Sequence, residues 1–263
     1  MQGSVSPSSW NNMMSNCEQD NFFSARLEEA LHSGEIQIHY QPVVRLDNQK
    51  MVGAEALLRW PGLDIGIEQV IKQAEEADVI DVVTAYVIGR VAEDLPRFRT
   101  VNADFQISIN IAPQELASGS LLNRVKDYAS SLPARALSFE ITERQFAPLE
   151  KIAGNLTVLR DHGYQVYVDD FGTGFSSMSR LFNLPVDGFK LDPSFLQAAH
   201  SGGAIRAMAA FAKELGVEMV VEGVETKAHQ TLLMAVDKEI FAQGWLFGPP
   251  MKSLDLLCAL LIN

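Results

Sequence analysis

The sequence alternates between short apolar segments and longer segments with helical spacing. Eight segments rich in β-branched and aromatic residues predict strands at Ile36–Val44, Val52–Trp60, Phe105–Ile111, Leu137–Thr142, Val166–Val168, Gly188–Leu191, Met219–Val224 and Ile240–Phe247. Between most of these strands, apolar residues spaced three and four apart predict helices at Ile67–Ala77, Val83–Leu95, Leu121–Ser131, Leu149–His162, Ala204–Leu215 and Lys227–Val236. Gly163 and Gly216 each follow a predicted helix, where a glycine commonly forms the C-terminal cap.

The lengths of the connections predict how the strands pair. Only Arg45–Lys50 separates the first two strands, which is a hairpin length and predicts an antiparallel pair. The later strands are joined through helices, which predicts parallel neighbours. Eight strands with helices between them in about 240 residues predict an α/β fold, a (β/α)8 TIM-like barrel with its first strand antiparallel. A doubly wound open sheet is the alternative.

The two ends of the chain differ from this pattern. Residues 1–21 are rich in Ser and Asn and lack an apolar core, which predicts a flexible N-terminal tail or the remnant of a linker. An amphipathic helix follows at Phe22–His32, and residues 22–263 are predicted to form one domain. The apolar run Leu254–Ile262 carries Asp255 and is shorter than the roughly 20 residues of a membrane span, so it predicts a final helix.

The amino-acid composition excludes several classes of binding partner and of metal site. The 263 residues are 47% hydrophobic and 21% charged, as in a globular protein with a core. The net charge of −12 predicts no binding to DNA or RNA and no contact with an anionic membrane by this chain itself. Two cysteines, Cys17 and Cys258, with no CxxC pattern predict neither a disulfide framework nor a zinc site, and suit a reducing cytoplasm.

Polar residues fall near the ends of the predicted strands. In a parallel barrel the carboxyl ends of the strands form one face, where catalytic side chains gather. From the second strand to the eighth, the polar residues are Glu55 and Arg59, Asn110, Glu140 and Glu143, Asp169 and Asp170, Lys190 and Asp192, Glu222 and Glu225, and Gln243. Burying this many charges is costly unless they are paired or coordinated.

The stretch Gln165–Gly174 carries the strongest chemical signal. A short apolar strand ends in the adjacent carboxylates Asp169 and Asp170, and a turn with two glycines follows. Neighbouring carboxylates repel one another, and Lys190 and Arg59 cannot neutralise all the nearby acids, so a divalent cation pair is predicted. Oxygen ligands without His or Cys favour Mg²⁺ or Mn²⁺. A structural Asp pair that caps the next helix is the alternative for this stretch taken alone.

Two classes of hydrolase fit acids at a barrel mouth. A glycoside hydrolase needs only two carboxylates, which would leave the Asp pair, Asn110 and Lys190 without a role. A two-metal hydrolase uses all of these residues, because carboxylates hold the metals and a lysine holds the attacking water.

Together the motifs resemble the EAL-domain family of cyclic di-GMP phosphodiesterases. The matching segments occur in family order across residues 40–250: Tyr40-Gln41-Pro42, Glu55-Ala56-Leu57 continuing to Arg59, Ser108-Ile109-Asn110, Glu140-Ile141-Thr142-Glu143, Asp169–Gly174, Lys190-Leu191-Asp192, Glu222-Gly223-Val224-Glu225 and Gln243-Gly244. The resemblance implies an EAL-type barrel that hydrolyses cyclic di-GMP to linear pGpG in the bacterial cytoplasm. It places the protein in the control of biofilm formation and motility.

The resemblance also implies a role for each matching residue. One metal would be held by Glu55, Asn110, Glu140 and Asp169. Asp169 would bridge to a second metal, completed by Asp170 and Glu222. Lys190 would hold the nucleophilic water, and Glu55 and Glu222 would also be catalytic residues. For Glu222 the resemblance leaves two roles open, metal ligand and general base. The substrate-binding set would be Gln41, Glu55, Leu58, Arg59, Asp192, Glu225 and Gln243. Magnesium or manganese would support the reaction, and calcium would inhibit it.

Two loops bear on regulation and on substrate binding. Glu143 with the loop Phe171, Gly172, Thr173 and Gly174 would couple the metals to the interface of a homodimer. The family's longer loop after the second strand is here the shortened Pro61–Glu68, on the substrate face. This favours the alternative of a catalytically weak cyclic di-GMP receptor or protein-binding regulator. An unrelated barrel phosphoesterase is a third reading, and an upstream sensor or membrane region is possible.

Overall fold

The computed structural model of the protein describes residues 16–128, 132–133, 135–142, 149–172, 181–198 and 200–262. This part of the chain separates into two compact units. One unit joins the chain up to Ile38 to Leu58–Val87, and the other joins His39–Leu57 to the chain from Ile88 onward. The assignment of residues 1–21 to a tail and 22–263 to one domain stays a prediction.

The described part of the first unit contains two helices and the start of a third. In this unit α1 (Asn16–Ser33) packs against α2 (Ile67–Glu76), and α1 begins before the helix predicted from Phe22. The guanidinium of Arg26 bonds to Glu35 and lies 5.2 Å from the ring centre of Trp60. The Tyr86 hydroxyl donates a 2.7 Å hydrogen bond to the Ile36 carbonyl.

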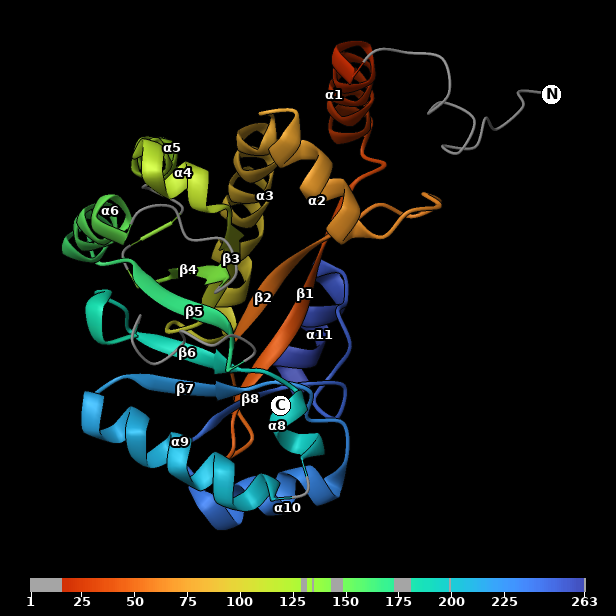
Figure 1. Ribbon diagram of the computed structural model, residues 1–263. Coiled ribbons are helices and arrows are strands. Elements are labelled where there is room, and N and C mark those ends of the chain that lie inside the picture. The colour runs from red at the N-terminus through yellow and green to blue at the C-terminus, as the bar shows by residue number, and fades with distance from the viewer. Residues whose placement is uncertain are drawn as a thin grey trace. The chain divides into compact units, whose positions relative to one another are not determined.

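The second unit contains the barrel. Each strand pairs with the next along the chain, and β8 pairs back to β1 to close the ring (Figure 1). From β2 to β8 the pairs are parallel, whereas β1 runs antiparallel to β8. The strands are β1 Gln37–Arg45, β2 Met51–Arg59, β3 Gln106–Ile111, β4 Leu137–Thr142, β5 Gln165–Phe171, β6 Gly188–Leu191, β7 Glu218–Val221 and β8 Phe241–Gln243. The predicted barrel with an antiparallel first strand is confirmed, and the open sheet is excluded.

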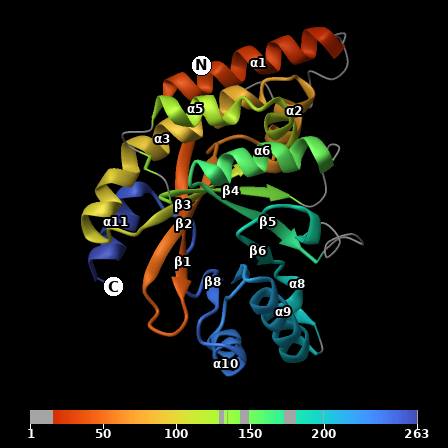
Figure 2. The same cartoon turned by 90° about the vertical axis from the view of Figure 1, so that its left-hand side faces the viewer.

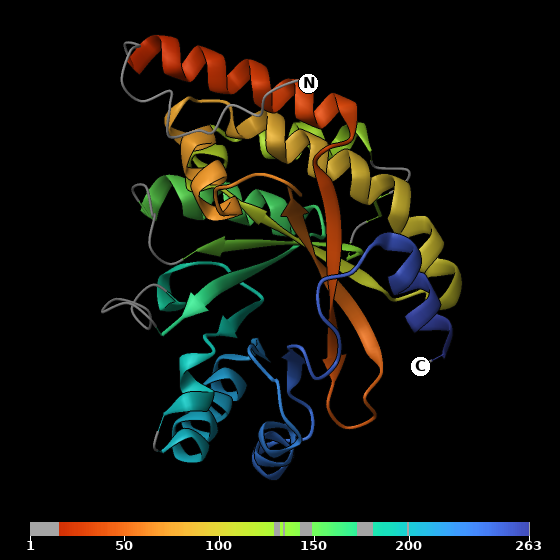
Figure 3. The ribbon, with the colours of Figure 1, turned by 90° about the vertical axis from the view of Figure 1, so that its right-hand side faces the viewer.

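Burial along the strands explains why they form. In β1 every second residue is buried, which is the alternation of a strand with one face on the core. All four residues of β6 are buried, as expected for a parallel strand covered on both faces. Figures 2 and 3 show β1 and β2 as a long orange hairpin, closed where Arg45 N donates a 3.0 Å hydrogen bond to the Lys50 carbonyl.

Helices cover the outside of the barrel. In the second unit α6 (Leu149–Asp161) packs on β5, α9 (Ser201–Leu215) packs on β7, and α10 (Lys227–Val236) packs on α9 (Figures 1 and 2). Thr226 caps α10 by accepting a hydrogen bond from His229 N, and α9 ends at Gly216 with a left-handed φ of 67°. The remaining helices are α3 Ile80–Val101, α4 Pro113–Ser118, α5 Leu121–Asp127, α8 Ser194–Gln197 and α11 Ser253–Ile262. No helix in these described ranges is long and apolar enough to cross a membrane.

Some predicted boundaries are wrong, and each error has a physical reason. The helix predicted at Val83–Leu95 ends just before Pro96, a residue that lacks a backbone donor and disfavours the interior of a helix. The observed helix continues to Val101, since Leu95 and Phe98 are completely buried and Phe98 packs against Tyr40 and Phe105. Packing therefore outweighs the local cost of the proline. The short helix α4, which begins with Pro113, was not predicted.

Candidate metal and catalytic site

A buried lysine lies at the centre of the site. Lys190 is on β6, and only 2% of its side chain is exposed. Its ammonium nitrogen Nζ lies near four carboxylates: 2.8 Å from Glu222 Oε1, 2.9 Å from Glu55 Oε2, 2.9 Å from Glu140 Oε2 and 3.4 Å from Asp169 Oδ1. One ammonium group is therefore shared among four carboxyl groups.

The barrel brings these groups together from four strands and the loop after a fifth. Glu55 is on β2, Glu140 on β4, Asp169 on β5 and Lys190 on β6. Glu222 comes directly after β7, where its backbone N–H donates to the Leu191 carbonyl. The predicted seventh strand extended to Val224, so the observed end places Glu222 in the loop rather than in the sheet. The structure therefore brings together five of the charged residues that were predicted near the strand ends.

The two adjacent aspartates of β5 reach the same site because the strand is irregular. The predicted strand ended at Val168, but β5 continues through the Asp pair to Phe171. In a regular strand Asp169 and Asp170 would point to opposite faces. Instead Asp170 has a left-handed φ of 53°, and the pairing of β5 with β6 shifts register between Val168 and Phe171. Aspartate tolerates this conformation better than most residues.

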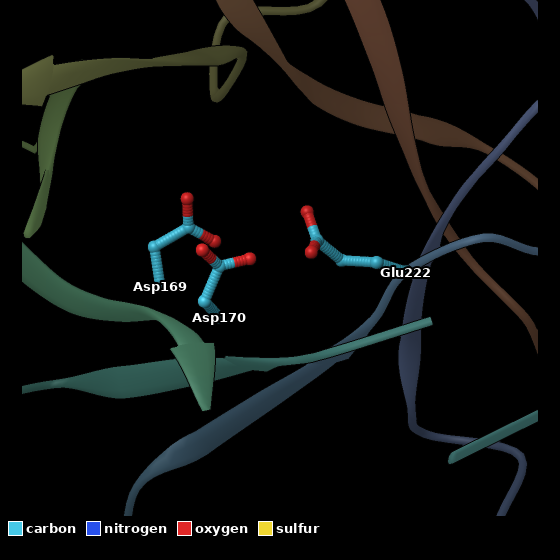
Figure 4. A group of neighbouring side chains, drawn as sticks. All are labelled: Asp169, Asp170 and Glu222. Atoms are coloured by element: carbon cyan, nitrogen blue, oxygen red, sulfur yellow. The ribbon is translucent and has the colours of Figure 1, made fainter. Parts of the chain in front are cut away.

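As a result, carboxylate oxygens of Asp169, Asp170 and Glu222 lie within 4.8 Å of one another. Figure 4 shows the Asp169 and Asp170 carboxylates side by side, with Glu222 reaching toward them from the opposite side. A backbone conformation that costs free energy at this position is typical of a functional site.

Side-chain amides fix the carboxylate of Glu55. Asn110 Nδ2 donates a 2.7 Å hydrogen bond to Glu55 Oε1, and Gln243 Nε2 donates a 2.7 Å hydrogen bond to Glu55 Oε2. Gln243 also donates to Gln41 Oε1 at 3.2 Å. Glu55 is thereby held by two amides as well as by Lys190, and its position does not depend on the lysine alone.

Burial and charge shift the acidities of this cluster in different directions. Burial raises the pKa of Glu55, but the Lys190 charge and its hydrogen bonds outweigh burial and hold that pKa below its usual value. Burial, and then the charge of Glu55, raises the pKa of Glu140 well above its usual value. Burial and the charges of Asp169 and Glu55 raise the pKa of Glu222 to about 7. The surrounding carboxylates hold the pKa of Lys190 well above its usual value despite its burial.

The side chains present fit divalent cations. Asp170 adds a fifth carboxylate to the four around Lys190, so negative charge exceeds positive charge in this cluster. Within this cluster, the buried oxygens Asp169 Oδ1 and Gln243 Oε1 accept no hydrogen bond from the described residues, and the nearest cation to Asp169 Oδ1 is Lys190 Nζ at 3.4 Å. Buried acceptors without a hydrogen bond are costly, and a bound cation satisfies them. Carboxylate and amide oxygens are the ligands that Mg²⁺ and Mn²⁺ prefer.

Other predicted residues make contacts within their own segments of the chain. Asp192 Oδ1 accepts a 2.8 Å hydrogen bond from Ser194 N and so shapes the turn after β6. Glu225 is exposed in the loop after β7. Leu58 and Arg59 belong to the first unit, where Arg59 Nη1 donates to the Leu58 carbonyl. Their contact with a substrate stays a prediction.

Only part of the predicted regulatory loop is described. The Phe171 ring is buried and lies 4.6 Å from the ring of Phe189. Gly172 has a φ of 99°, and a Cβ there would approach the Phe195 ring to 2.4 Å. Glycine is therefore required at this position. Glu143, Thr173 and Gly174 lie outside the described residues.

Sequence reasoning missed a cavity at the other end of the barrel. Its volume is about 230 Å³, and it reaches from Arg45, Asp104 and Glu218 inward to Glu140 and Lys190. This volume holds several water molecules. Ser108, which was expected only as part of a motif, is another neighbour of Glu140 and lowers its pKa by hydrogen bonding. Its position two residues before Asn110 on β3, hence on the same face, was the available signal.

Comparison with known proteins identifies the family. The model of the family described as "EAL domain" matches residues 24–250. The chain belongs to the EAL domain family. The resemblance read from the ordered motifs is thereby confirmed.

Named relatives of this EAL domain are bacterial. The probable cyclic di-GMP phosphodiesterase PdeB of Escherichia coli (strain K12) is 34% identical over 237 residues, covering 88% of this chain and 46% of PdeB. Cyclic di-GMP phosphodiesterase RocR of Pseudomonas aeruginosa is 31% identical over 244 residues, covering 89% of this chain and 62% of RocR. This EAL domain thus spans less than two thirds of the length of these relatives.

A solved structure supports the same assignment. The PaMucR phosphodiesterase in complex with c-di-GMP is 30% identical to this EAL domain, with a TM-score of 0.78. The match covers 89% of this chain and 99% of that one. The likeness therefore extends over a complete chain of known structure.

Proposed function

We propose that this EAL domain is a metal-dependent phosphodiesterase that hydrolyses cyclic di-GMP to linear pGpG. The observation that carries the proposal is the convergence of Asp169, Asp170 and Glu222 beside the cluster around Lys190. A cyclic dinucleotide presents two phosphodiesters, and their hydrolysis requires charge stabilisation and an activated water. The names of PdeB and RocR and the ligand of the PaMucR structure support this substrate.

Two groups of residues would hold two divalent cations, Mg²⁺ or Mn²⁺. Glu55, Asn110, Glu140 and Asp169 would hold one, and Asp169, Asp170 and Glu222 would hold the other. When bound, such cations lower the pKa of water and offset negative charge on phosphate oxygens. Asp169 belongs to both groups and has a buried oxygen that accepts no hydrogen bond from the described residues, which supports a bridging position.

Lys190 would position the attacking water. Because neighbouring carboxylates raise its pKa far above neutral, Lys190 stays protonated and acts as a hydrogen-bond donor rather than as a base. Its Nζ contacts carboxylates of both proposed cation groups, so it lies where a water between them would be held. The water oxygen forms the new bond to phosphorus, and the bond to the 3′ oxygen breaks.

Glu222 has two possible roles, cation ligand and general base. A carboxyl group with a pKa of about 7 exchanges its proton near neutral pH, as a general base must. In the second role Glu222 takes the proton of the attacking water, and the 3′ oxygen that leaves gains a proton. Its short distances to Lys190 and to the Asp pair are compatible with either role.

Further residues would bind the substrate and regulate the activity. Gln41, Leu58, Arg59, Asp192, Glu225 and Gln243 would contact the dinucleotide or orient the residues that do. Glu143 and the loop that starts at Phe171 would link the site to the interface of a homodimer. We place the reaction in the bacterial cytoplasm, where it would lower the messenger that controls biofilm formation and motility.

The test is turnover of cyclic di-GMP by the purified chain with Mg²⁺ or Mn²⁺, with pGpG followed by chromatography. We expect turnover with both metals and none with Ca²⁺, whose longer and looser coordination suits the reaction poorly. Asp169→Asn should abolish turnover, whereas Asp255→Asn, an exposed acid on α11, should not. Binding in Ca²⁺ without turnover in Mg²⁺ would make the protein a receptor instead.

A further inference from the structure

A tryptophan at the carboxyl end of β8 is far more exposed than tryptophan usually is. The side chain of Trp245 is 71% exposed to solvent. Tryptophan carries a large apolar surface and is on average highly buried. The sequence motifs used above stop at Gly244, so none of them gave Trp245 a role.

Trp245 lies at the same end of the barrel as the carboxylate cluster. Strands β6, β7 and β8 are parallel, so their carboxyl ends share one face. Lys190 lies on β6, Glu222 follows β7, and β8 ends at Gln243, whose side chain contacts Glu55. Trp245 comes two residues after Gln243 and therefore belongs to the rim of the candidate site.

The backbone on both sides of Trp245 is fixed. Val224 N donates a 3.0 Å hydrogen bond to the Gln243 carbonyl, and Leu246 N donates a 3.0 Å hydrogen bond to the Val224 carbonyl. Phe247 N also donates to the Gly244 carbonyl at 3.0 Å. A Cβ on Gly244 would approach Val224 backbone atoms to 2.3 Å, so the loops after β7 and β8 are in direct contact. The exposed indole therefore projects from a rigid segment.

We propose that Trp245 is the surface on which one guanine base of cyclic di-GMP stacks. This inference rests on the proposed function and adds to it a residue that recognises the base. The carboxylates and amides of the site suit cations and hydroxyl groups, whereas the flat face of a purine base stacks well on an aromatic ring. A rigid aromatic ring loses little conformational entropy when the base binds, so its stacking adds directly to affinity.

The experiment compares Trp245→Ala and Trp245→Phe with the unaltered chain in steady-state hydrolysis of cyclic di-GMP. Loss of one stacked base lowers affinity by roughly 10-fold. We expect Trp245→Ala to raise KM about 10-fold with kcat changed less than about 2-fold, and Trp245→Phe to recover most of the loss. An unchanged KM would overturn the inference. A loss of kcat together with a lower unfolding temperature would also overturn it, because the role would then be structural.

Intrinsic fluorescence gives a second, independent readout. The chain has three tryptophans, Trp10, Trp60 and Trp245. Cyclic di-GMP added in Ca²⁺ should quench the emission of the unaltered chain and of Trp60→Phe, but not that of Trp245→Phe. Quenching that requires Trp245, without any turnover, would reject the proposed hydrolysis but support stacking on Trp245. Turnover with equal quenching in Trp245→Phe and in the unaltered chain would support the hydrolysis but reject stacking on Trp245. If the chain shows neither binding nor turnover of cyclic di-GMP, both proposals are rejected.

Discussion

The side-chain amide of Gln243, at the end of β8, donates a 2.7 Å hydrogen bond to Glu55 on β2. Gln243 is 3% exposed and also donates to Gln41, so it connects the first, second and eighth strands. An amide that orients a cation ligand acts through that ligand rather than on the substrate. Such partners typically change metal affinity when they are removed.

Gln243→Ala should therefore weaken the binding of Mg²⁺ and raise the Mg²⁺ concentration that activity requires. We expect the Mg²⁺ concentration for half-maximal activity to rise about 10- to 100-fold, because Glu55 loses one of its two amide donors. Activity at saturating Mg²⁺ should fall less. The matched control is Gln230→Ala, which removes a buried glutamine of α10 that bonds to Lys227 outside the site. An equal Mg²⁺ requirement in Gln243→Ala and the unaltered chain would contradict a positioning role.

Lys190→Met should destabilise the metal-free chain and abolish turnover. Methionine is of similar length and uncharged, so four carboxylates would lose their common partner. Removing one partner of a buried ion pair costs about 3–5 kcal/mol of the free energy of unfolding. Urea unfolding in EDTA measures this loss, and added Mg²⁺ should restore part of it. Lys213→Met on α9 replaces an exposed lysine and should change neither quantity.

Tyr40→Phe should destabilise the barrel without affecting the site. The Tyr40 hydroxyl donates a 2.8 Å hydrogen bond to Asp94 Oδ2, and both residues are buried. The phenylalanine variant leaves a buried carboxylate short of a donor, which costs about 1–3 kcal/mol. Tyr86→Phe breaks a bond to the neutral Ile36 carbonyl and should cost less. Thermal unfolding of the two variants makes the comparison, and equal losses would mean that the charge of Asp94 is irrelevant.

The sequence placed the site residues at one end of the barrel because two physical rules act together. The apolar strand pattern and the short first connection determine the fold class, and the direction of each strand then determines which end its last residue reaches. The positions of Glu55, Glu140 and Lys190 in their strands were enough to predict that they lie near one end of the barrel. The contact of both glutamates with the Lys190 ammonium group could not be predicted, because it depends on how the strands close into a ring.

Other features depended on packing that the sequence does not display. The continuation of α3 past Pro96 follows from the burial of Phe98 between aromatic rings. The extension of β5 through Asp169 and Asp170 requires a left-handed residue inside a strand, whereas propensity favours a turn there. The cavity beneath Lys190 arises from the sizes of side chains on all eight strands.

Asp170→Gly should separate backbone strain from cation binding. Glycine adopts the left-handed φ of 53° freely, so relative to Asp170→Asn it should stabilise the metal-free chain by about 1 kcal/mol. Neither variant offers the Asp170 carboxylate, and both should lose turnover. Urea unfolding in EDTA measures the free energy of unfolding of both variants. Because both lack the Asp170 charge, the difference between them does not arise from that charge. Equal stability of the glycine and asparagine variants would show that the strand stores no strain at this residue.

The stability of the metal-free chain should depend on pH through Glu222. Burial and neighbouring carboxylates raise the pKa of Glu222 from 4.5 to about 7. Between these two values the folded chain binds more protons than the unfolded chain, so the free energy of unfolding falls as pH rises from about 4.5 to about 7. Above pH 7 this contribution is constant. The total change from Glu222 is on the order of 3 kcal/mol.

Urea unfolding in EDTA at pH 5 and pH 8 measures this fall, and Glu222→Gln provides the matched control because it cannot titrate. The fall should be clearly smaller in Glu222→Gln, with the remainder arising from Glu140, whose pKa is also raised by burial. Mg²⁺ should reduce the pH dependence of the unaltered chain, because a bound cation holds the Glu222 carboxylate ionised at lower pH. A fall of the same size in both proteins would show that the Glu222 carboxyl group is not the titrating group.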